Sequence, residues 1–224
     1  MNNPSHFIFA FPAPAMTDPR KPGISSRRQP KQARSSELVG AILEAAIQVL
    51  EKVGAHRFTT TRVAERAGVS VGSVYQYFPN KAAILFRLQS DEWQQTSAML
   101  ARILDDAGTP PLERLRILVL TFVRSECEEA GVRTALDDAA PYYRDAPEAL
   151  EAKASGTRMF QAFIQELLPD AEESVRAMAG DLLMTTLSAV GKQFSETPRT
   201  DAEISAYADA LADMLCAYLA KLAG

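Results

Sequence analysis

Helical periodicity runs through residues 35–222 and is interrupted only by prolines, glycines and short polar turns. The first apolar stripe has steps of three and four and comprises Leu38, Ile42, Ala45, Val49 and Val53. Further helices are expected over 58–68, 71–77, 81–106, 111–129, 132–140, 147–168, 171–195 and 201–222. No alternating β pattern or Asn-Gly hairpin signal occurs. The pattern predicts an all-α fold, with an N-terminal three-helix, homeodomain-like helix-turn-helix module and a helical body of about five to six helices.

Charge is divided unevenly along the chain. Residues 1–88 hold 12 Lys and Arg against 5 Asp and Glu, a balance of +7, whereas residues 89–224 hold 12 against 23, a balance of −11. This asymmetry indicates a basic module that binds a polyanion, attached to an acidic body that does not. The two cysteines have neither disulfide-framework nor metal-ligand spacing, and no apolar run reaches the ~20 residues of a membrane span. We therefore expect no metal, no other cofactor, no membrane association and a reducing cytoplasmic location.

The first 34 residues lack an apolar period and are expected to form a disordered basic arm. The apolar stretch near the start is interrupted by Pro12 and follows no Lys or Arg, so it does not fit a signal peptide. Translation from Met16 instead of Met1 is an alternative. The arm's cations either follow the minor groove, add counterion release or stay solvated without a defined contact. These cations are Arg27, Arg28, Lys31 and Arg34.

The segment 71–77 is barely two turns long, which is too short for a helix that is stable alone. Gly68 can end the helix before it, Ser70 can cap its start and Pro79 ends it. Three helices in this order form a helix-turn-helix, whose third helix enters the DNA major groove. We expect the flanking apolar residues to hold one side of the short helix and to leave the other side for DNA.

Residues in this motif, 59–78, and just after it are the candidates for DNA contact. Gly72 permits close approach, Val71 can touch a thymine methyl group, and polar side chains beside them can read base edges. Hydroxyls and free N–H groups at the start of the second helix offer a site for a phosphate. Lys81 adds a cation for the same strand. The full set is Thr59, Thr60, Thr61, Arg62, Ser70, Val71, Gly72, Ser73, Tyr75, Gln76, Tyr77 and Lys81.

The stretch from Thr59 to Lys81, TTTRVAERAGVSVGSVYQYFPNK, resembles the N-terminal signature of the TetR family of bacterial transcriptional regulators. The family pattern places a turn glycine, a phosphate-binding tyrosine, a packing aromatic and a phosphate-binding lysine at Gly68, Tyr75, Phe78 and Lys81. The LacI family shares VAE.AGVS, but it continues with a different third helix and a long α/β domain. Two features depart from the TetR pattern: the long N-terminal arm, and Val71 where a basic or polar residue is more usual.

The resemblance implies a DNA-binding domain over residues 36–96 and a ligand-binding and dimerisation domain over residues 97–224. Such bodies commonly bind a small, apolar or amphipathic ligand among their middle helices. The candidate pocket residues are Trp93, Met99, Phe122, Tyr142, Tyr143, Phe160, Phe163 and Met184, although any helical core also needs residues of this kind.

The last two helices carry heptad-like apolar repeats, which predict either a four-helix dimer interface or packing within one chain. The candidate interface residues are Ala179, Leu182, Thr186, Ala208, Leu211, Leu215, Tyr218 and Leu222.

The expected function is sequence-specific transcriptional repression by a homodimer that binds a palindromic double-stranded operator and is released by a small-molecule effector. Activation instead of repression stays open. So does a regulator or architectural factor of the same fold that has no ligand. Catalysis is not expected, because His6 and His56 are the only histidines and no nucleophile, metal or phosphate-loop arrangement can be placed.

Overall fold

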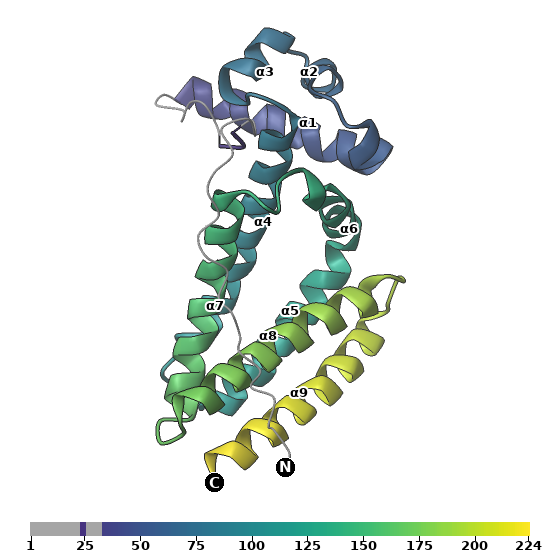
Figure 1. Cartoon of the computed structure of the whole chain (residues 1–224). Helices are drawn as coiled ribbons and strands as arrows, with labels where there is room; N and C mark the ends of the chain where they lie inside the picture. Colours follow the sequence, from purple (N-terminus) through teal and green to yellow (C-terminus); the bar gives the residue numbers. More distant parts are fainter. Residues whose placement is uncertain (1–22, 26–32) are drawn as a thin grey trace, which may run out of the picture.

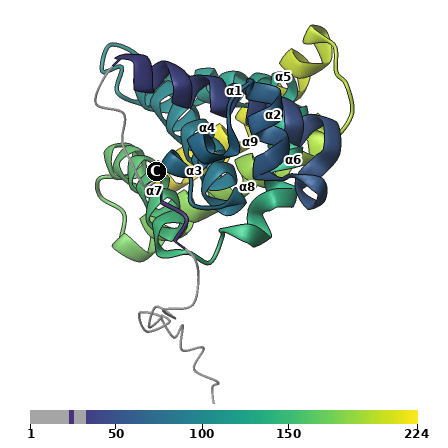
Figure 2. The same ribbon diagram turned by 90° about the horizontal axis from the view of Figure 1, so that it is seen from above.

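The computed structural model describes residues 23–25 and 33–224, and all regular elements in these residues are helical. Helices α1 (Ala33–Arg57), α2 (Thr60–Ala67) and α3 (Val71–Tyr77) form a head at one end, from which α4 (Lys81–Leu104) leads into the body (Figure 1). The body adds α5 (Pro111–Glu128), α6 (Ala130–Ala139), the 3-10 helix η1 (Ala140–Tyr142), α7 (Pro147–Leu167), α8 (Glu173–Ser195) and α9 (Asp201–Ala223). Seen from above, the head overlies the body helices (Figure 2). This arrangement confirms the predicted all-α fold.

The N-terminal part of the chain differs from its prediction. Helix α1 begins at Ala33, so Arg34 belongs to a helix and not to a disordered arm. Residues 23–25 lie against the folded protein, with the Ile24 side chain only 5% exposed. The rest of the predicted arm, including Arg27, Arg28 and Lys31, lies outside the described residues. An isolated apolar residue such as Ile24 has no periodic neighbours, so the sequence gives no sign of its burial.

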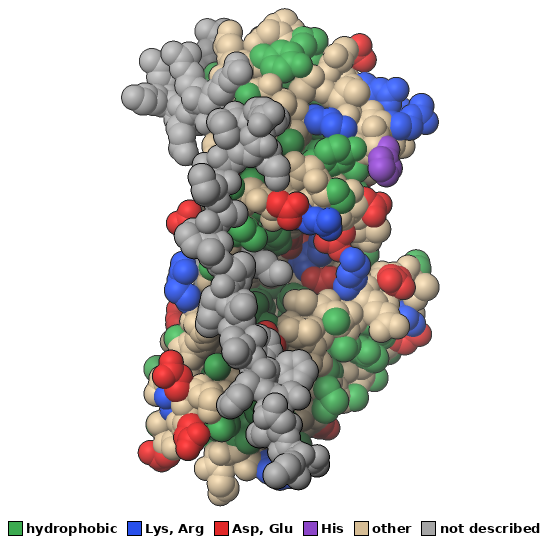
Figure 3. Space-filling model, in the orientation of Figure 1, with side chains coloured by type: hydrophobic (Ala, Val, Ile, Leu, Met, Phe, Trp, Pro, Cys, Tyr) green, Lys and Arg blue, Asp and Glu red, His purple; other side chains and the backbone are tan. Residues whose placement is uncertain are grey.

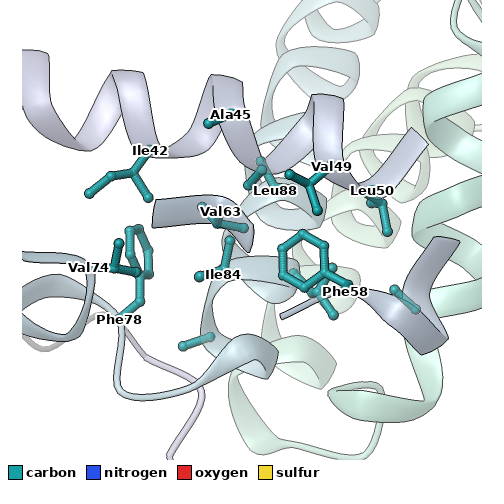
Figure 4. Close-up of a cluster of buried hydrophobic side chains, with 14 of the residues drawn as sticks. Ile42, Ala45, Val49, Leu50, Phe58, Val63, Val74, Phe78, Ile84 and Leu88 are labelled. Carbon is teal, nitrogen blue, oxygen red and sulfur yellow. The ribbon is translucent and has the colours of Figure 1, made fainter. Parts of the chain in front are cut away.

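The first hydrophobic cluster fills the head. Side chains from α1, α3 and α4 meet there around Phe58 and Phe78, both of which are fully buried (Figure 4). Four residues that follow the head in sequence complete this cluster: Leu136, Ala139, Tyr143 and Ala149. The head core is therefore not confined to the predicted 36–96 domain, because α6, η1 and the start of α7 seal one side of it.

The second cluster lies in the body, where α5 packs against both α8 and α9. Helix α4 contributes Leu88 to the first cluster and Leu100 to the second, so the predicted boundary between 96 and 97 falls inside one continuous helix. Helices α5 and α8 approach each other closely at Gly191, where an added Cβ atom would lie 2.8 Å from Phe122 Cε1. A side chain at this position would clash with the phenyl ring.

Buried polar contacts fix α6 and η1 against α4. The Tyr143 hydroxyl shares its one proton between two acceptors, Gln89 Oε1 at 3.0 Å and the Leu136 carbonyl oxygen at 3.1 Å. Gln89 Nε2 donates to Glu92 Oε2 at 3.0 Å, and Arg133 Nη2 lies 3.1 Å from Glu92 Oε1. Arg133 also pairs with Glu126 and Glu129. Burial raises the pKa of the Glu92 and Glu126 carboxyls, and the Arg133 charge opposes that rise. The charge balance of this cluster therefore depends on Arg133.

In the part of the chain that the structure describes, no helix is both long enough and apolar enough to cross a bilayer. The same residues contain no group of three or more His, Cys, Asp or Glu side chains placed to hold a metal ion.

Candidate nucleic-acid interface

Local capping sets the geometry of α2 and α3. Thr59 Oγ1 accepts from the Arg62 N–H at 3.2 Å at the start of α2, and Ser70 Oγ accepts from the Ser73 N–H at 3.0 Å at the start of α3. Gly68 ends α2 with φ 69°, in the left-handed region that glycine adopts without strain. The Ser70 cap and the Gly68 end are those that the sequence predicts, and together they define the turn between the two helices.

One face of α3 is buried and the other is free. Val74, on the helix, and Phe78, which caps its C-terminus, are fully buried in the head core. Gly72 and Gln76 are exposed, Val71 and Ser73 are half-buried, and Tyr75 is 41% exposed. The outward face therefore carries small and polar groups at the end of the molecule farthest from α9 (Figure 1).

Gly72 contributes a gap to this face that packing inside the protein does not explain. An added Cβ atom would meet only Ser70 Oγ, at 3.7 Å, which is an ordinary contact. Helix propensity favours alanine over glycine at such a position. The missing side chain thus suits the approach of an external partner to the α3 backbone.

Tyr77 differs from its prediction. Its side chain is only 7% exposed and belongs to the head core, so it packs α3 against its neighbours and does not lie at a groove edge. The reason is the helical period: Tyr77 follows Val74 by three residues and therefore shares its inward face. Tyr75 and Gln76 lie on the outward side.

The start of α2 and the middle of α3 meet through two hydroxyls. The Tyr75 hydroxyl oxygen lies 3.2 Å from Thr60 Oγ1, and Thr60 itself is buried. Thr59 and Thr61 are exposed beside them, next to the free N–H groups of the α2 N-terminus. Arg62 Nη1 donates to the Arg57 carbonyl at 3.1 Å. Hydroxyls, N–H groups and a fixed guanidinium thus gather where a phosphate can be bound.

Charge supports the same face. Lys and Arg side chains gather at the right edge of the head, beside the histidine and below an acidic side chain, whereas side chains of both signs are spread over the junction and the body (Figure 3). Lys81, the first residue of α4, differs from the other predicted phosphate contacts. Its Nζ lies 4.0 Å from the centroid of the Tyr142 ring in η1.

The predicted ligand-pocket residues fall into two groups. Phe122, Phe160 and Phe163 are buried in the body core, Met99 and Met184 pack against it, and Trp93 is half-buried on α4. Tyr142 and Tyr143 belong instead to the head cluster. These two tyrosines therefore lie apart from the other pocket candidates, because η1 folds back against α4.

The predicted dimer-interface residues are mostly turned inward. Ala179, Ala208, Leu211 and Leu215 are buried within one protomer, and Tyr218 and Leu222 pack against the same core. Thr186 is half-buried, and Leu182 alone among the eight is exposed, at 44%. The heptad-like repeat of α9 thus marks the face that packs on α5. Sequence reasoning missed a second, outward stripe with the same spacing, which includes Tyr207 and Met214.

Two family models match the chain. The model described as bacterial regulatory proteins of the tetR family matches residues 42–88, and the model of the tetracyclin repressor-like C-terminal domain matches residues 110–222.

Among curated proteins, the chain is 29% identical over 126 residues to the HTH-type transcriptional repressor KstR of Rhodococcus jostii, covering 56% of this chain and 58% of that protein. It is 39% identical over 85 residues to the nucleoid occlusion factor SlmA of Vibrio campbellii, covering 36% and 43%. The chain thus matches less than two thirds of the length of these relatives.

Among solved structures, the transcriptional regulator FadR of Bacillus subtilis in complex with stearoyl-CoA superposes with a TM-score of 0.66 at 16% identity. The match covers 80% of this chain and 97% of FadR. At this identity, the likeness concerns the fold.

Proposed function

The chain belongs to the TetR family of bacterial transcriptional regulators, and from this premise we propose that it is an operator-binding repressor that a small ligand releases. The observation that carries the proposal is the outward face of α3, where Gly72 leaves a gap that internal packing does not require and Gln76 and Tyr75 are exposed. In a helix-turn-helix protein this face enters the major groove. Ser73 and Gln76 then read base edges, while Thr59, Thr61 and Tyr75 hold phosphates. The protein acts in the cytoplasm, on operator DNA.

The acting unit is a homodimer. Four large apolar side chains stand exposed on α8 and α9: Met178 at 57%, Leu182 at 44%, Tyr207 at 38% and Met214 at 55%. Figure 3 shows hydrophobic side chains gathered over these two helices. Two such surfaces bury each other in a four-helix arrangement, which removes the apolar area from water. A two-fold axis through this contact places two copies of α3 about one DNA turn apart, ~34–36 Å, to match a palindrome.

The effector is a small apolar or amphipathic molecule that binds in the body. The aromatic and sulfur-containing side chains of the body core support this, since they can rearrange around an apolar ligand. FadR of Bacillus subtilis, whose body has this fold, was solved with stearoyl-CoA, an amphipathic ligand. A ligand that prefers one body conformation weakens DNA binding, and DNA then weakens ligand binding to the same extent.

A second candidate is a DNA-binding factor without a small-molecule signal. The similarity to the nucleoid occlusion factor SlmA, at 39% identity over 85 residues, favours it. Purified protein that carries, or is thermally stabilised by, an apolar compound supports the repressor. Stabilisation by DNA alone supports the second candidate.

Selection of bound duplexes from a random DNA pool tests the proposal. A repressor dimer selects a palindrome whose half-sites lie about one turn apart. Gln76→Ala then changes the preferred bases at one position of each half-site, by about 1–3 kcal/mol of discrimination. A pool without enrichment, or a single asymmetric site, contradicts the dimeric operator.

A further inference from the structure

Lys81 is the cation of the proposed interface that the body itself contacts. It opens α4, directly after the turn that follows α3, and its Nζ lies 4.0 Å from the centre of the Tyr142 ring. A cation above an aromatic face at this distance is attracted by the ring quadrupole. Tyr142 is the last residue of η1, between α6 and α7. Lys81 is thus a candidate phosphate-binding cation of the head, and its ammonium contacts Tyr142 of a body segment.

The backbone around Lys81 is fixed, so the side chain is the part that can move. Asn80 Oδ1 accepts from the Ala83 N–H at 2.9 Å and caps α4. Asn80 Nδ2 donates to the Gly23 carbonyl at 3.2 Å, and the neighbouring Ile24 is buried in the head core. The corner before α4 is therefore held both by its own cap and by the N-terminal segment. A flexible lysine side chain on this fixed corner has two directions available to it.

The position of the Tyr142 ring depends on the body. The adjacent Tyr143 is buried and packs against Phe86 with ring centroids 5.9 Å apart. Its hydroxyl lies within hydrogen-bond distance of Gln89 and of the Leu136 carbonyl of α6. Gln89 in turn contacts Glu92, the partner of Arg133 on α6. A shift of α6 against α4 changes these contacts and moves η1 with them. The position of the Tyr142 ring beside Lys81 therefore depends on how α6 packs against α4.

The two partners of Lys81 lie in different directions. In Figure 1, α3 caps the outer end of the molecule, while the segment between α6 and α7 lies on the body side of the head. The Lys81 ammonium contacts the Tyr142 ring, which belongs to this segment on the body side. To bind a DNA phosphate, the Lys81 side chain must turn toward the outer face and lose its contact with the Tyr142 ring.

We infer that Tyr142 is an autoinhibitory partner of Lys81: its ring holds the ammonium on the body, and displacement of η1 releases the ammonium to a DNA phosphate. This inference rests on the proposed DNA-binding function. If the cation–π contact no longer competes with DNA, the affinity for DNA should rise about two- to five-fold per subunit. For a dimer, the rise is about the square of that factor. Each lysine that joins the interface adds about 0.9 to the slope of log affinity against log salt concentration.

The test compares Tyr142→Leu with Tyr142→Phe in the full chain, using the duplex selected from the random pool. Tyr142→Leu removes the ring and is expected to bind DNA about 4- to 25-fold more tightly in the dimer, with a steeper salt dependence. Tyr142→Phe keeps the ring and is expected to bind like the wild type. In a Lys81→Gln background, Tyr142→Leu is expected to have no effect, because the cation it frees is gone.

Equal or weaker DNA binding by Tyr142→Leu, or the same gain in the Lys81→Gln background, overturns the inference. If the wild type itself enriches no duplex, the proposed function fails instead, so the two failures are distinct. A second measurement needs no variant that must fold: the Lys81 ε-methylene protons of the free wild type should show an upfield ring-current shift in NMR spectra. That shift should vanish when DNA binds, and an unshifted signal in the free protein overturns the inference.

Discussion

The outer faces of α3 and of the α8–α9 pair lie at opposite ends of the molecule and have opposite chemistry (Figure 1). The α3 face offers a glycine, hydroxyls and an amide, with arginines beside it. The α8–α9 face offers Met178, Leu182, Tyr207 and Met214. An exposed polar face suits a hydrated polyanion, whereas an exposed apolar face suits a second protein surface. The contrast teaches that one helical scaffold carries two separate recognition tasks.

The largest expected effect distinguishes the two stripes of α9. Leu215→Ala removes a side chain that is 3% exposed, and it should lower the free energy of unfolding by about 2–5 kcal/mol because it leaves a cavity. The neighbouring Met214→Ala, at a position 55% exposed, should change protomer stability little. Urea denaturation of both variants measures this, at a concentration below that at which the protein dimerises. Equal losses would mean that the outward stripe is also part of the protomer core.

The next effect concerns the apolar face as a whole. Leu182→Glu combined with Met214→Glu places charges at the proposed dimer centre, so sedimentation equilibrium should report a monomer. Affinity for a duplex with two half-sites should then fall about 100-fold or more. In a monomer the second DNA-binding head is no longer joined to the first, so the second half-site must be bound independently. Leu150→Glu is the matched control, since Leu150 is exposed to 57% near the start of α7, next to Ala149 of the head cluster. A double variant that remains dimeric would place the interface elsewhere.

Two glycines separate a position that packing inside the protein requires from one that the approach of DNA is proposed to require. Gly191→Ala puts a methyl group 2.8 Å from the Phe122 ring, and it should cost about 1–3 kcal/mol of stability. Gly72→Ala meets no obstacle inside the protein and should raise the unfolding free energy by about 0.5–1 kcal/mol. DNA titration of Gly72→Ala should nevertheless show weaker binding. If Gly72→Ala binds DNA with unchanged affinity, DNA does not approach the α3 backbone closely at this position.

The smallest expected effect separates the two tyrosines of α3. Tyr75→Phe deletes the hydroxyl beside Thr60 and should weaken binding to all duplexes by about 0.5–1.5 kcal/mol, without changing the selected sequence. Tyr77→Phe should leave DNA affinity close to that of the wild type, because the ring lies in the core. Fluorescence anisotropy with two unrelated duplexes measures both. A larger loss for Tyr77→Phe would restore its predicted groove contact.

The sequence predicts the local features of this protein well. Ser70 caps α3 and Gly68 ends α2 as expected, because such signals depend on neighbours within one turn. The outward position of Gln76 and Tyr75 follows from the same periodicity. Contacts between distant segments are predicted poorly. Burial of Ile24 and the return of Tyr142 and Tyr143 to the head depend on packing across more than fifty residues of chain.

The choice of stripe on α9 is a different kind of failure. A heptad-like repeat states that one face of a helix is apolar, but not whether its partner belongs to the same chain. On α9 both faces carry such a repeat: Ala208, Leu211 and Leu215 pack on α5, while Tyr207 and Met214 remain outside. Only the placement of α5 tells the two apart.

Because α4 is shared by both cores, the DNA-reading end of this protein is not an interchangeable part. A chimera that grafts residues 36–96 onto a foreign body would carry the recognition helix but lose Leu136, Tyr143 and Ala149, which seal its interior. Such a graft would expose apolar surface and misfold or aggregate. A transplant meant to redirect this regulator to a new signal needs to keep the native chain through Ala149 and exchange only residues closer to the C-terminus.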